Sequence, residues 1–131
     1  MKVINTSSSR KRAVARATLK EGKGIIRYNS MPLAHITNML VREKIEEPLF
    51  IGGKIAESVD IHVKTHGGGP IGQAEAARTA IAKALTEFDK SLEPIFLEYD
   101  RTLLVKDVRR KETHKPNRHG KARAKVQKSY R

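Results

Sequence analysis

The sequence predicts an α+β domain in which a small sheet takes a helix closely on one side, followed by a long basic tail. Two patterns predict the domain. Residues 13–20 and 59–64 alternate apolar with polar positions, which is the period of a half-buried strand. Residues 73–88 instead carry apolar side chains at helical spacing, on a stripe rich in alanine that can approach a sheet closely. We therefore expect one layer of helix on one layer of strands.

The first two strands are expected to form a β-hairpin. Residues 21–24 read Glu-Gly-Lys-Gly, a turn sequence, and residues 25–29 beyond it have the character of a second strand. Arg12, Arg16 and Lys20 are four residues apart, so they point from the same face of the first strand. The predicted hairpin therefore carries basic side chains on one face.

Two further helices are expected. Residues 32–44 begin with a proline, which suits the first turn of a helix, and continue with apolar residues at helical spacing. Pro48 and the glycine pair 52–53 are expected to end that region. A shorter helix over residues 92–99 follows a serine that can cap it. Beyond residue 105 the hydrophobic signal ends.

The charge of the chain is concentrated at its two ends. The formal net charge is +13 in 131 residues, which indicates a polyanionic partner. Residues 1–20 hold six Lys or Arg and no acid, and residues 101–131 hold twelve basic and two acidic residues. Residues 21–100 hold nine basic and twelve acidic residues and are almost neutral. A plain solubility tail is the alternative, but such tails are more often acidic.

Several classes of protein are disfavoured by what the sequence lacks. There is no cysteine, so disulfides and thiolate metal sites are excluded. Met1–Arg12 has no apolar run of signal-peptide length, and a basic amphipathic helix for a membrane surface is missing. His62 and His66 would lie about 13 Å apart on a strand, and His114 and His119 have no acidic ligand arranged near them. We expect a soluble, non-enzymatic protein without metal or cofactor.

The glycine-rich segment at residues 67–72 satisfies the spacing G-x-G-x-x-G between a strand and a helix. A dinucleotide site needs a second parallel strand that ends near an acid about 20 residues on, whereas Glu87 and Asp89 lie at a helix end. A P-loop lysine is also missing. Two interpretations remain open: a tight turn that brings the alanine-rich helix onto the sheet, and backbone N–H groups that receive a phosphate of a polymer.

Residues 106–131 have the composition of an extended nucleic-acid-binding tail. They hold too little apolar surface to order themselves, so the free tail is expected to be disordered, with a reach on the order of 80 Å. From Lys121 to Val126 basic residues alternate with Ala and Val, which lets an extended chain place alternate side chains on phosphates in an RNA groove. Pro116 and Gly120 break any continuous helix, which disfavours a basic-region helix in DNA. A histone-like or architectural DNA binder is the main rival.

From about Ser9 to Arg131 the chain resembles the small-subunit ribosomal protein nine family. The resemblance lies in several motifs kept in order: Arg10–Ala17, Gly22-Lys23-Gly24 with Asn29, Gly67–Ala74 with Arg78 after it, Leu103-Leu104 followed by Asp107 and Arg109, and Gly120–Arg131. The Ser-Tyr-Arg ending resembles the archaeal and eukaryotic branch, and the short chain favours an archaeal member. Residues 113–119 depart from the family pattern.

The resemblance implies both a fold and a function. The fold would be a mostly antiparallel four-stranded sheet with helices on one face, in a left-handed β-α-β arrangement like the second domain of ribosomal protein S-five. Residues 1–105 would form this domain and residues 106–131 the basic tail. The chain would be a structural constituent of the small subunit of the cytoplasmic ribosome. It would contact neighbouring ribosomal proteins and the ribosomal RNA of the subunit head, and its tail would reach the anticodon stem-loop of peptidyl-site transfer RNA.

The charge pattern and the resemblance together predict the site residues. Those expected to bind ribosomal RNA are Arg10, Lys11, Arg12, Arg16, Gly67, Gly68, Gly69, Gln73, Arg109, Arg110, Lys111, Lys115, Arg118, Lys121, Arg123 and Lys125. Those expected to approach transfer RNA are Lys128, Ser129, Tyr130 and Arg131.

Overall fold

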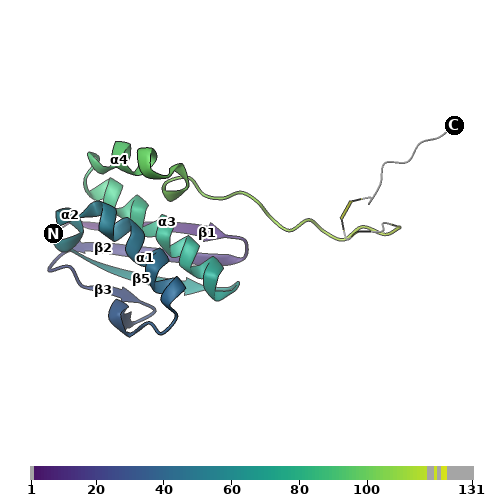
Figure 1. Cartoon of the computed structure of the whole chain (residues 1–131), viewed down its shortest axis with the longest axis horizontal. Coiled ribbons are helices and arrows are strands. Elements are labelled where there is room, and N and C mark those ends of the chain that lie inside the picture. Colours follow the sequence, from purple (N-terminus) through teal and green to yellow (C-terminus); the bar gives the residue numbers. More distant parts are fainter. Residues whose placement is uncertain (1, 118–119, 121, 124–131) are drawn as a thin grey trace.

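The computed structural model describes residues 2–117, 120 and 122–123, which form a five-stranded sheet with helices on one face (Figure 1). The strands are β1 Val3–Arg10, β2 Ala13–Glu21, β3 Ile26–Tyr28, β4 Met31–Pro32 and β5 Val59–His66. The helices are α1 Met39–Gly52, α2 Lys54–Glu57, α3 Pro70–Phe88 and α4 Leu92–Tyr99, with short 3-10 turns η1 Leu33–His35 and η2 Arg101–Leu103. The α+β class is confirmed, but the sheet has five strands rather than four.

The order of strands in the sheet is β1-β2-β5-β3-β4. Strand β5 lies between β2 and β3, antiparallel to the first and parallel to the second, so the predicted hairpin of residues 13–20 and 25–29 is wrong. The cause is Asp60 of β5, whose carboxylate accepts the backbone N–H groups of Lys23 and Ile25, both at 2.9 Å. These bonds hold the turn at residues 22–25 across the end of β5. The chain therefore reaches the side of β5 away from β2, where β3 forms.

The hairpin that does form joins β1 to β2 through Lys11 and Arg12, with Lys11 at a φ of 55°. The sequence analysis did not predict β1, because this strand is rich in Ser, Thr and Asn and buries mainly Ile4 and Ser8. A hydrogen bond ties β1 to the helix packed on the sheet: the hydroxyl of Thr6 donates to the carbonyl oxygen of Ala80 on α3 at 2.8 Å. The basic residues therefore lie at the end of β1, which holds Arg10, and in the turn that follows, which holds Lys11 and Arg12.

Small side chains at the centre of the core let α3 lie close against the sheet. Ala13, Ala15 and Ala17 of β2 are fully buried, and so are most alanines of α3. The predicted helix over residues 73–88 is confirmed, and it begins three residues earlier, at Pro70. Proline suits this position because the N–H groups of a first helical turn have no partner within the helix. The alternating residues 59–64 are confirmed as the main part of β5.

Helix α1 differs from the predicted helix over residues 32–44 at both ends. It starts after Asn38, whose side-chain oxygen accepts the N–H groups of Leu40 and Val41 at 3.1 and 3.4 Å. It then continues through Pro48, whose ring is buried in the core, and ends where Gly53 takes a φ of 54°. Burial of the proline ring offsets the one backbone hydrogen bond that the proline cannot donate.

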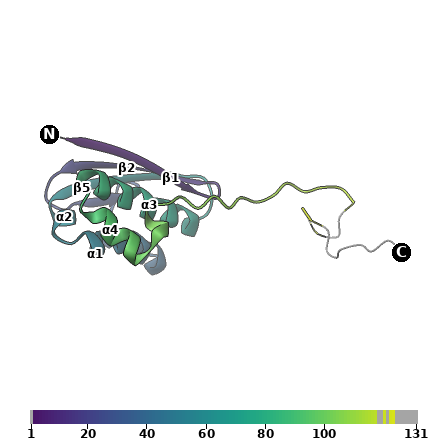
Figure 2. The same cartoon turned by 90° about the horizontal axis from the view of Figure 1, so that it is seen from above.

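The elements form layers, which Figure 2 shows from above. Helix α3 lies on the sheet, α1 and α4 lie on the side of α3 away from the strands, and the opposite face of the sheet is uncovered. Leu103 of η2 is the last fully buried residue among those described, and residues 106–115 have no regular secondary structure. Within the described residues, no helix has the length and apolar character needed to span a membrane.

Candidate nucleic-acid interface

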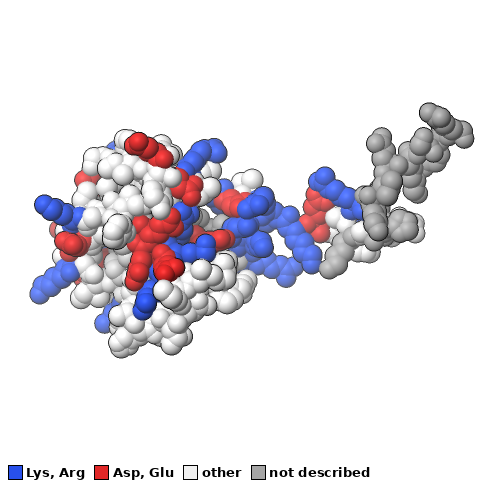
Figure 3. Space-filling view, viewed as in Figure 1, with Lys and Arg blue, Asp and Glu red and all other residues white. Residues whose placement is uncertain are grey.

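Three predicted segments that are far apart in sequence meet at one end of the sheet. They are the β1–β2 turn, the glycine-rich loop before α3 and the start of the tail. Together they line an open groove of about 1330 Å³. Its lining residues are Arg10, Lys11, Arg12, Gly68, Gly69, Pro70, Ile71, Gly72, Glu75, Arg109, Arg110, Lys111, Glu112 and Thr113. Figure 3 shows basic side chains gathered at this end of the molecule, where the tail leaves the domain.

The glycine-rich loop packs directly on the β1–β2 turn. Gly67 and Gly68 have φ values of 73° and 63°, in the left-handed region. A Cβ atom on Gly67 would lie 2.7 Å from the carbonyl oxygen of Arg12, and one on Gly68 would lie 2.8 Å from the nitrogen of Ala13. The loop is thus the tight turn of the first interpretation. Gly69 differs, because a Cβ atom there would meet nothing within 4 Å.

Gln73 holds this loop from inside the first turn of α3. Its amide nitrogen donates to the carbonyl oxygen of Gly67 at 3.0 Å, and its amide oxygen accepts from the hydroxyl of Thr65 at 3.2 Å. Asn29 pairs with Thr65 from the next strand, accepting its N–H and donating to its hydroxyl, both at 2.8 Å. Gln73 therefore shapes the groove through contacts within the protein, and its contact with RNA stays a prediction.

Arg10 is mostly buried beneath the groove, with 16% of its side chain exposed. Its Nε lies 3.0 Å from Glu75 of α3 and 3.4 Å from Asp107 at the start of the tail. Lys44 of α1 approaches the same Glu75 carboxylate at 3.3 Å. Arg10 thus ties the tail to the sheet and to α3, a role that sequence reasoning missed because its acidic partners lie 65 and 97 positions away.

The start of the tail is attached to the β1–β2 turn at two points. Besides the Arg10 pair, the guanidinium of Arg110 donates to the carbonyl oxygen of Lys11. Asp107 accepts bonds from the side chain and backbone N–H of Arg109, which together with the charge of Arg10 lower the pKa of Asp107 far below its ordinary value. We call these contacts of Asp107 and Arg110 the tail clamp. Lys11, Arg12 and Lys111 remain exposed around it.

Further along the tail, Arg123 forms a bidentate ion pair with Glu112. Its hydrogen bonds lower the pKa of Glu112. Lys115 is exposed. The other predicted tail residues lie outside the described residues: Arg118, Lys121, Lys125, Lys128, Ser129, Tyr130 and Arg131.

The uncovered face of the sheet carries a second group of basic side chains. Arg16 of β2 lies opposite Lys64 of β5, and Arg27 of β3 lies beside His62. All four side chains are exposed. Sequence reasoning placed Arg16 on this face but did not include Arg27 or Lys64 among the site residues. The alternation in residues 59–64 could have found Lys64, whereas the position of Arg27 depends on the parallel pairing of β3, which the hairpin prediction excluded.

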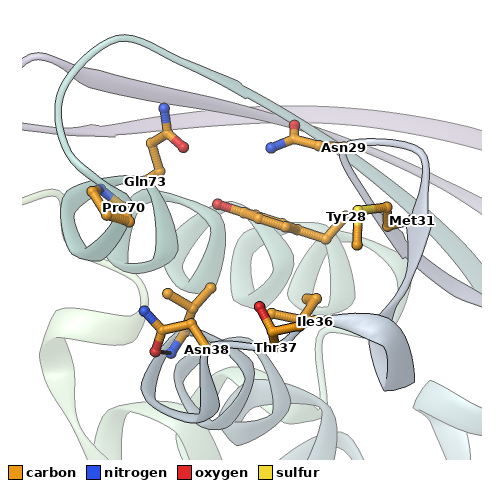
Figure 4. A pocket seen from close by; sticks show the side chains of 9 residues that line it. Tyr28, Asn29, Met31, Ile36, Thr37, Asn38, Pro70 and Gln73 are labelled. Carbon is orange, nitrogen blue, oxygen red and sulfur yellow. Dashed lines mark hydrogen bonds between the residues drawn. The ribbon is translucent and has the colours of Figure 1, made fainter.

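A smaller pocket of about 240 Å³ lies between the start of α3 and the cap of α1 (Figure 4). Tyr28 crosses it, with Pro70 and Gln73 on one side and Ile36, Thr37 and Asn38 on the other. Its lining among the described residues contains no Lys or Arg, so it does not suit the phosphates of a nucleotide. Nor do the described residues contain a group of three or more His, Cys, Asp or Glu side chains able to hold a metal ion.

Fold and surface together define a small basic α+β protein whose exposed cations gather on a groove and on an open sheet. Residues 8–131 match the family described as ribosomal protein S9/S16. The chain belongs to this family.

Full-length relatives agree with the family match. The small ribosomal subunit protein uS9 of Methanococcus vannielii is 48% identical over 134 residues, that of Methanothrix thermoacetophila 50% over 133 and that of Methanococcus maripaludis 46% over 134. In each case all of this chain and all of the relative are covered. The resemblance stated from motifs is thus confirmed, as is the expectation of a structural ribosomal protein rather than an enzyme. These relatives are archaeal, as the Ser-Tyr-Arg ending and the short chain together predict.

Proposed function

We propose that this chain is a structural constituent of the small subunit of the cytoplasmic ribosome, where it binds the ribosomal RNA of the head and extends its C-terminal residues to the transfer RNA in the peptidyl site. Residues 1–105 act as the folded body and residues 106–131 as the RNA-binding tail. The name of the full-length relatives supports the assignment to the small subunit.

The observation that carries the RNA-binding part is the convergence of two separate basic segments, the β1–β2 turn and the start of the tail, with the glycine-rich loop on one groove. Lys11, Arg12 and Lys111 project around it, while Arg10 and Arg110 fix its walls. Phosphate contacts by Lys and Arg supply most of the affinity for a nucleic-acid backbone. The loop N–H groups at the start of α3 add donors beside Gly69, where the surface is open.

The basic face of the sheet extends this interface. Arg16 and Lys64 lie about 5 Å apart on neighbouring strands, and Arg27 lies one strand further on, beside His62. This arrangement lets one flat surface meet several phosphates or 2′-hydroxyl groups of an RNA helix. We also propose that the crossover from β3 to β5 through α1 is left-handed, as the resemblance implies.

Removal of Ser129–Arg131 tests the transfer RNA contact. We expect the truncated chain to fold and enter the small subunit as before, because Ser129 comes 26 positions after Leu103, the last fully buried residue among those described. Peptidyl-site transfer RNA should bind the resulting subunits more weakly, as measured by filter binding against subunits with the full chain. Equal affinities of the two subunits would reject the contact.

Competition separates the ribosomal function from a general DNA-compacting function, which the same net charge would allow. A transcript of the 3′ major domain and a DNA duplex of equal length compete for the full chain at one fixed salt concentration. We expect the transcript to bind at least about tenfold more tightly, and equal affinity would favour the DNA binder.

A further inference from the structure

The outer side of α1 exposes apolar and acidic side chains in one row. Met39, Glu43, Glu46 and Phe50 follow the spacing i, i+4, i+7 and i+11, which places them on the same side of a helix. All four are exposed, and Phe50 is 90% and Met39 64% exposed. This side of α1 therefore combines two highly exposed apolar side chains with two carboxylates.

Helix α4 continues this surface. Ile95, Glu98 and Tyr99 share one side of α4, and Ile95 and Tyr99 are 48% and 59% exposed. The hydroxyl of Tyr99 lies against the Glu47 carboxylate of α1, whose hydrogen bond and charge raise the pKa of Tyr99. The two helices therefore present neighbouring surfaces. We define the acidic helical face as Met39, Glu43, Glu46, Phe50, Ile95, Glu98 and Tyr99.

The charges of this face are poorly compensated within the described part of the chain. Glu46 has one ion pair, with Arg42 at 3.9 Å, and both side chains of that pair are well exposed. Glu43 and Glu98 have no ion pair among the described residues. Figure 3 shows acidic side chains gathered over α1, away from the basic side chains where the tail leaves the domain.

We propose that the acidic helical face binds a neighbouring protein of the small subunit through a segment that is rich in Lys and Arg and carries apolar side chains for Phe50 and Met39. This inference rests on the proposed function, because it places the chain in the ribosome. RNA does not fit this face, since its phosphates would be repelled by the carboxylates. A basic protein segment matches both properties: its cations meet the glutamates, and its apolar side chains cover Phe50.

Photocrosslinking from position 50 tests the proposal. The full chain, with p-benzoylphenylalanine in place of Phe50, is assembled into small subunits, purified and irradiated, and the RNA is then digested. We expect a nuclease-resistant cross-link to another protein of the subunit, in a peptide rich in Lys and Arg. A cross-link to RNA, to a second copy of this chain, or no cross-link at all would overturn the proposal.

The same photoreactive residue in place of Arg12 serves as the positive control. It reports the RNA groove and should cross-link to ribosomal RNA if the proposed function is right. A cross-link from position 12 without one from position 50 would reject the acidic helical face alone. Absence of the RNA cross-link from position 12, in chains that do enter the subunit, would instead count against the proposed RNA groove.

Charge reversal then tests the chemistry of the partner. Glu43→Lys combined with Glu46→Lys should lower the yield of the protein cross-link from position 50 at least about fivefold, because the new charges repel a basic segment. The control is Glu21→Lys, which changes an exposed acid at the end of β2, in the sheet rather than on α1 or α4. It should leave the yield unchanged. An unchanged yield in the Glu43 and Glu46 variant would overturn the assignment of a basic partner.

Discussion

At the scale of single residues, Arg78 joins three parts of the helical layer. Its guanidinium donates to Glu47 of α1 at 2.7 and 3.1 Å, and to Asp100, which caps η2, at 3.1 Å. The hydroxyl of Thr102 accepts a further bond at 3.3 Å. With 13% of its side chain exposed, Arg78 forms a partly buried network rather than a surface ion pair.

Replacement of Arg78 by Ala should therefore lower the free energy of unfolding by about 2 kcal/mol, because two partly buried carboxylates lose their partner. Urea unfolding of the full chain measures the effect. The matched control is Arg42→Ala, which breaks the exposed pair with Glu46 and should cost less than about 0.5 kcal/mol. Equal midpoints for the Arg78 variant and the parent chain would contradict the prediction.

The same network predicts a dependence of stability on pH. Hydrogen bonds from Arg78 lower the pKa of Glu47 below its ordinary value of 4.5. A carboxyl whose pKa is lowered in the folded state stabilises the protein fully above its unfolded pKa and loses this contribution as the pH falls through the folded pKa. We expect the free energy of unfolding to decline as the pH falls below about 4.5, with a smaller decline in Glu47→Gln. Parallel pH curves for the two chains would reject this role of Glu47.

At the scale of elements, the loop between β5 and α3 needs glycine at Gly67 and Gly68 for steric reasons, but not at Gly69. Gly68→Ala should lower the free energy of unfolding by at least about 2 kcal/mol, since its φ is positive and the new Cβ would overlap Ala13. Gly69→Ala, in open space, should change it by less than about 1 kcal/mol. Thermal unfolding of both variants checks the contrast, and a Gly68 variant as stable as the parent would contradict it.

Gly69→Ala also separates the two interpretations of this loop. If a phosphate approaches the backbone there, the methyl group should weaken binding of a head RNA transcript while the fold stays intact. If the loop is a structural turn alone, RNA affinity should not change.

Elements whose pattern is local were predictable from the sequence. Strand β2, strand β5 and helix α3 each have a period that one buried face imposes on consecutive residues. Pairing was not predictable, because the position of β3 depends on the side chain of Asp60, which comes 35 residues after Ile25. The start of α1 was missed because Asn38 is a stronger start signal than Pro32.

The candidate site shows the same division. Lys11, Arg12 and Lys111 could be predicted from charge, and their convergence could not, since it requires the β1–β2 hairpin. Arg10 looks identical to its neighbours in sequence, yet it is buried against Glu75. A charged residue and its distant partner are linked only by the fold.

At the scale of the whole molecule, basic and acidic side chains lie on different faces. The open face of the sheet and the groove carry exposed basic side chains. Acidic side chains instead gather over the outer side of α1 (Figure 3). With the proposed function, we expect this separation to orient the chain in the electrostatic field of the RNA, so that the basic side faces the phosphates and the acidic side faces away.

Arg16→Ala combined with Lys64→Ala tests the basic sheet. We expect affinity for the head RNA transcript to fall about tenfold, and the slope of log affinity against log salt to become shallower by about two. Filter binding over a salt series measures both. The control combines Lys54→Ala with Lys90→Ala, two exposed lysines outside the sheet, and should keep the parent slope. An unchanged slope in the Arg16 and Lys64 variant would remove this face from the interface.

The tail clamp has a geometric consequence. Because Arg110 is fixed to the β1–β2 turn, the tail is a tether whose origin is set by the body. The residues from Arg110 to Arg131 span at most about 70 Å, and release of the clamp back to Leu104 would lengthen the tether by roughly 20 Å. A shorter tether raises the effective concentration of its tip near targets within reach. The clamp thus sets the maximum reach of the tip, because this distance depends on the number of residues beyond the clamp and not on how tightly those residues bind RNA.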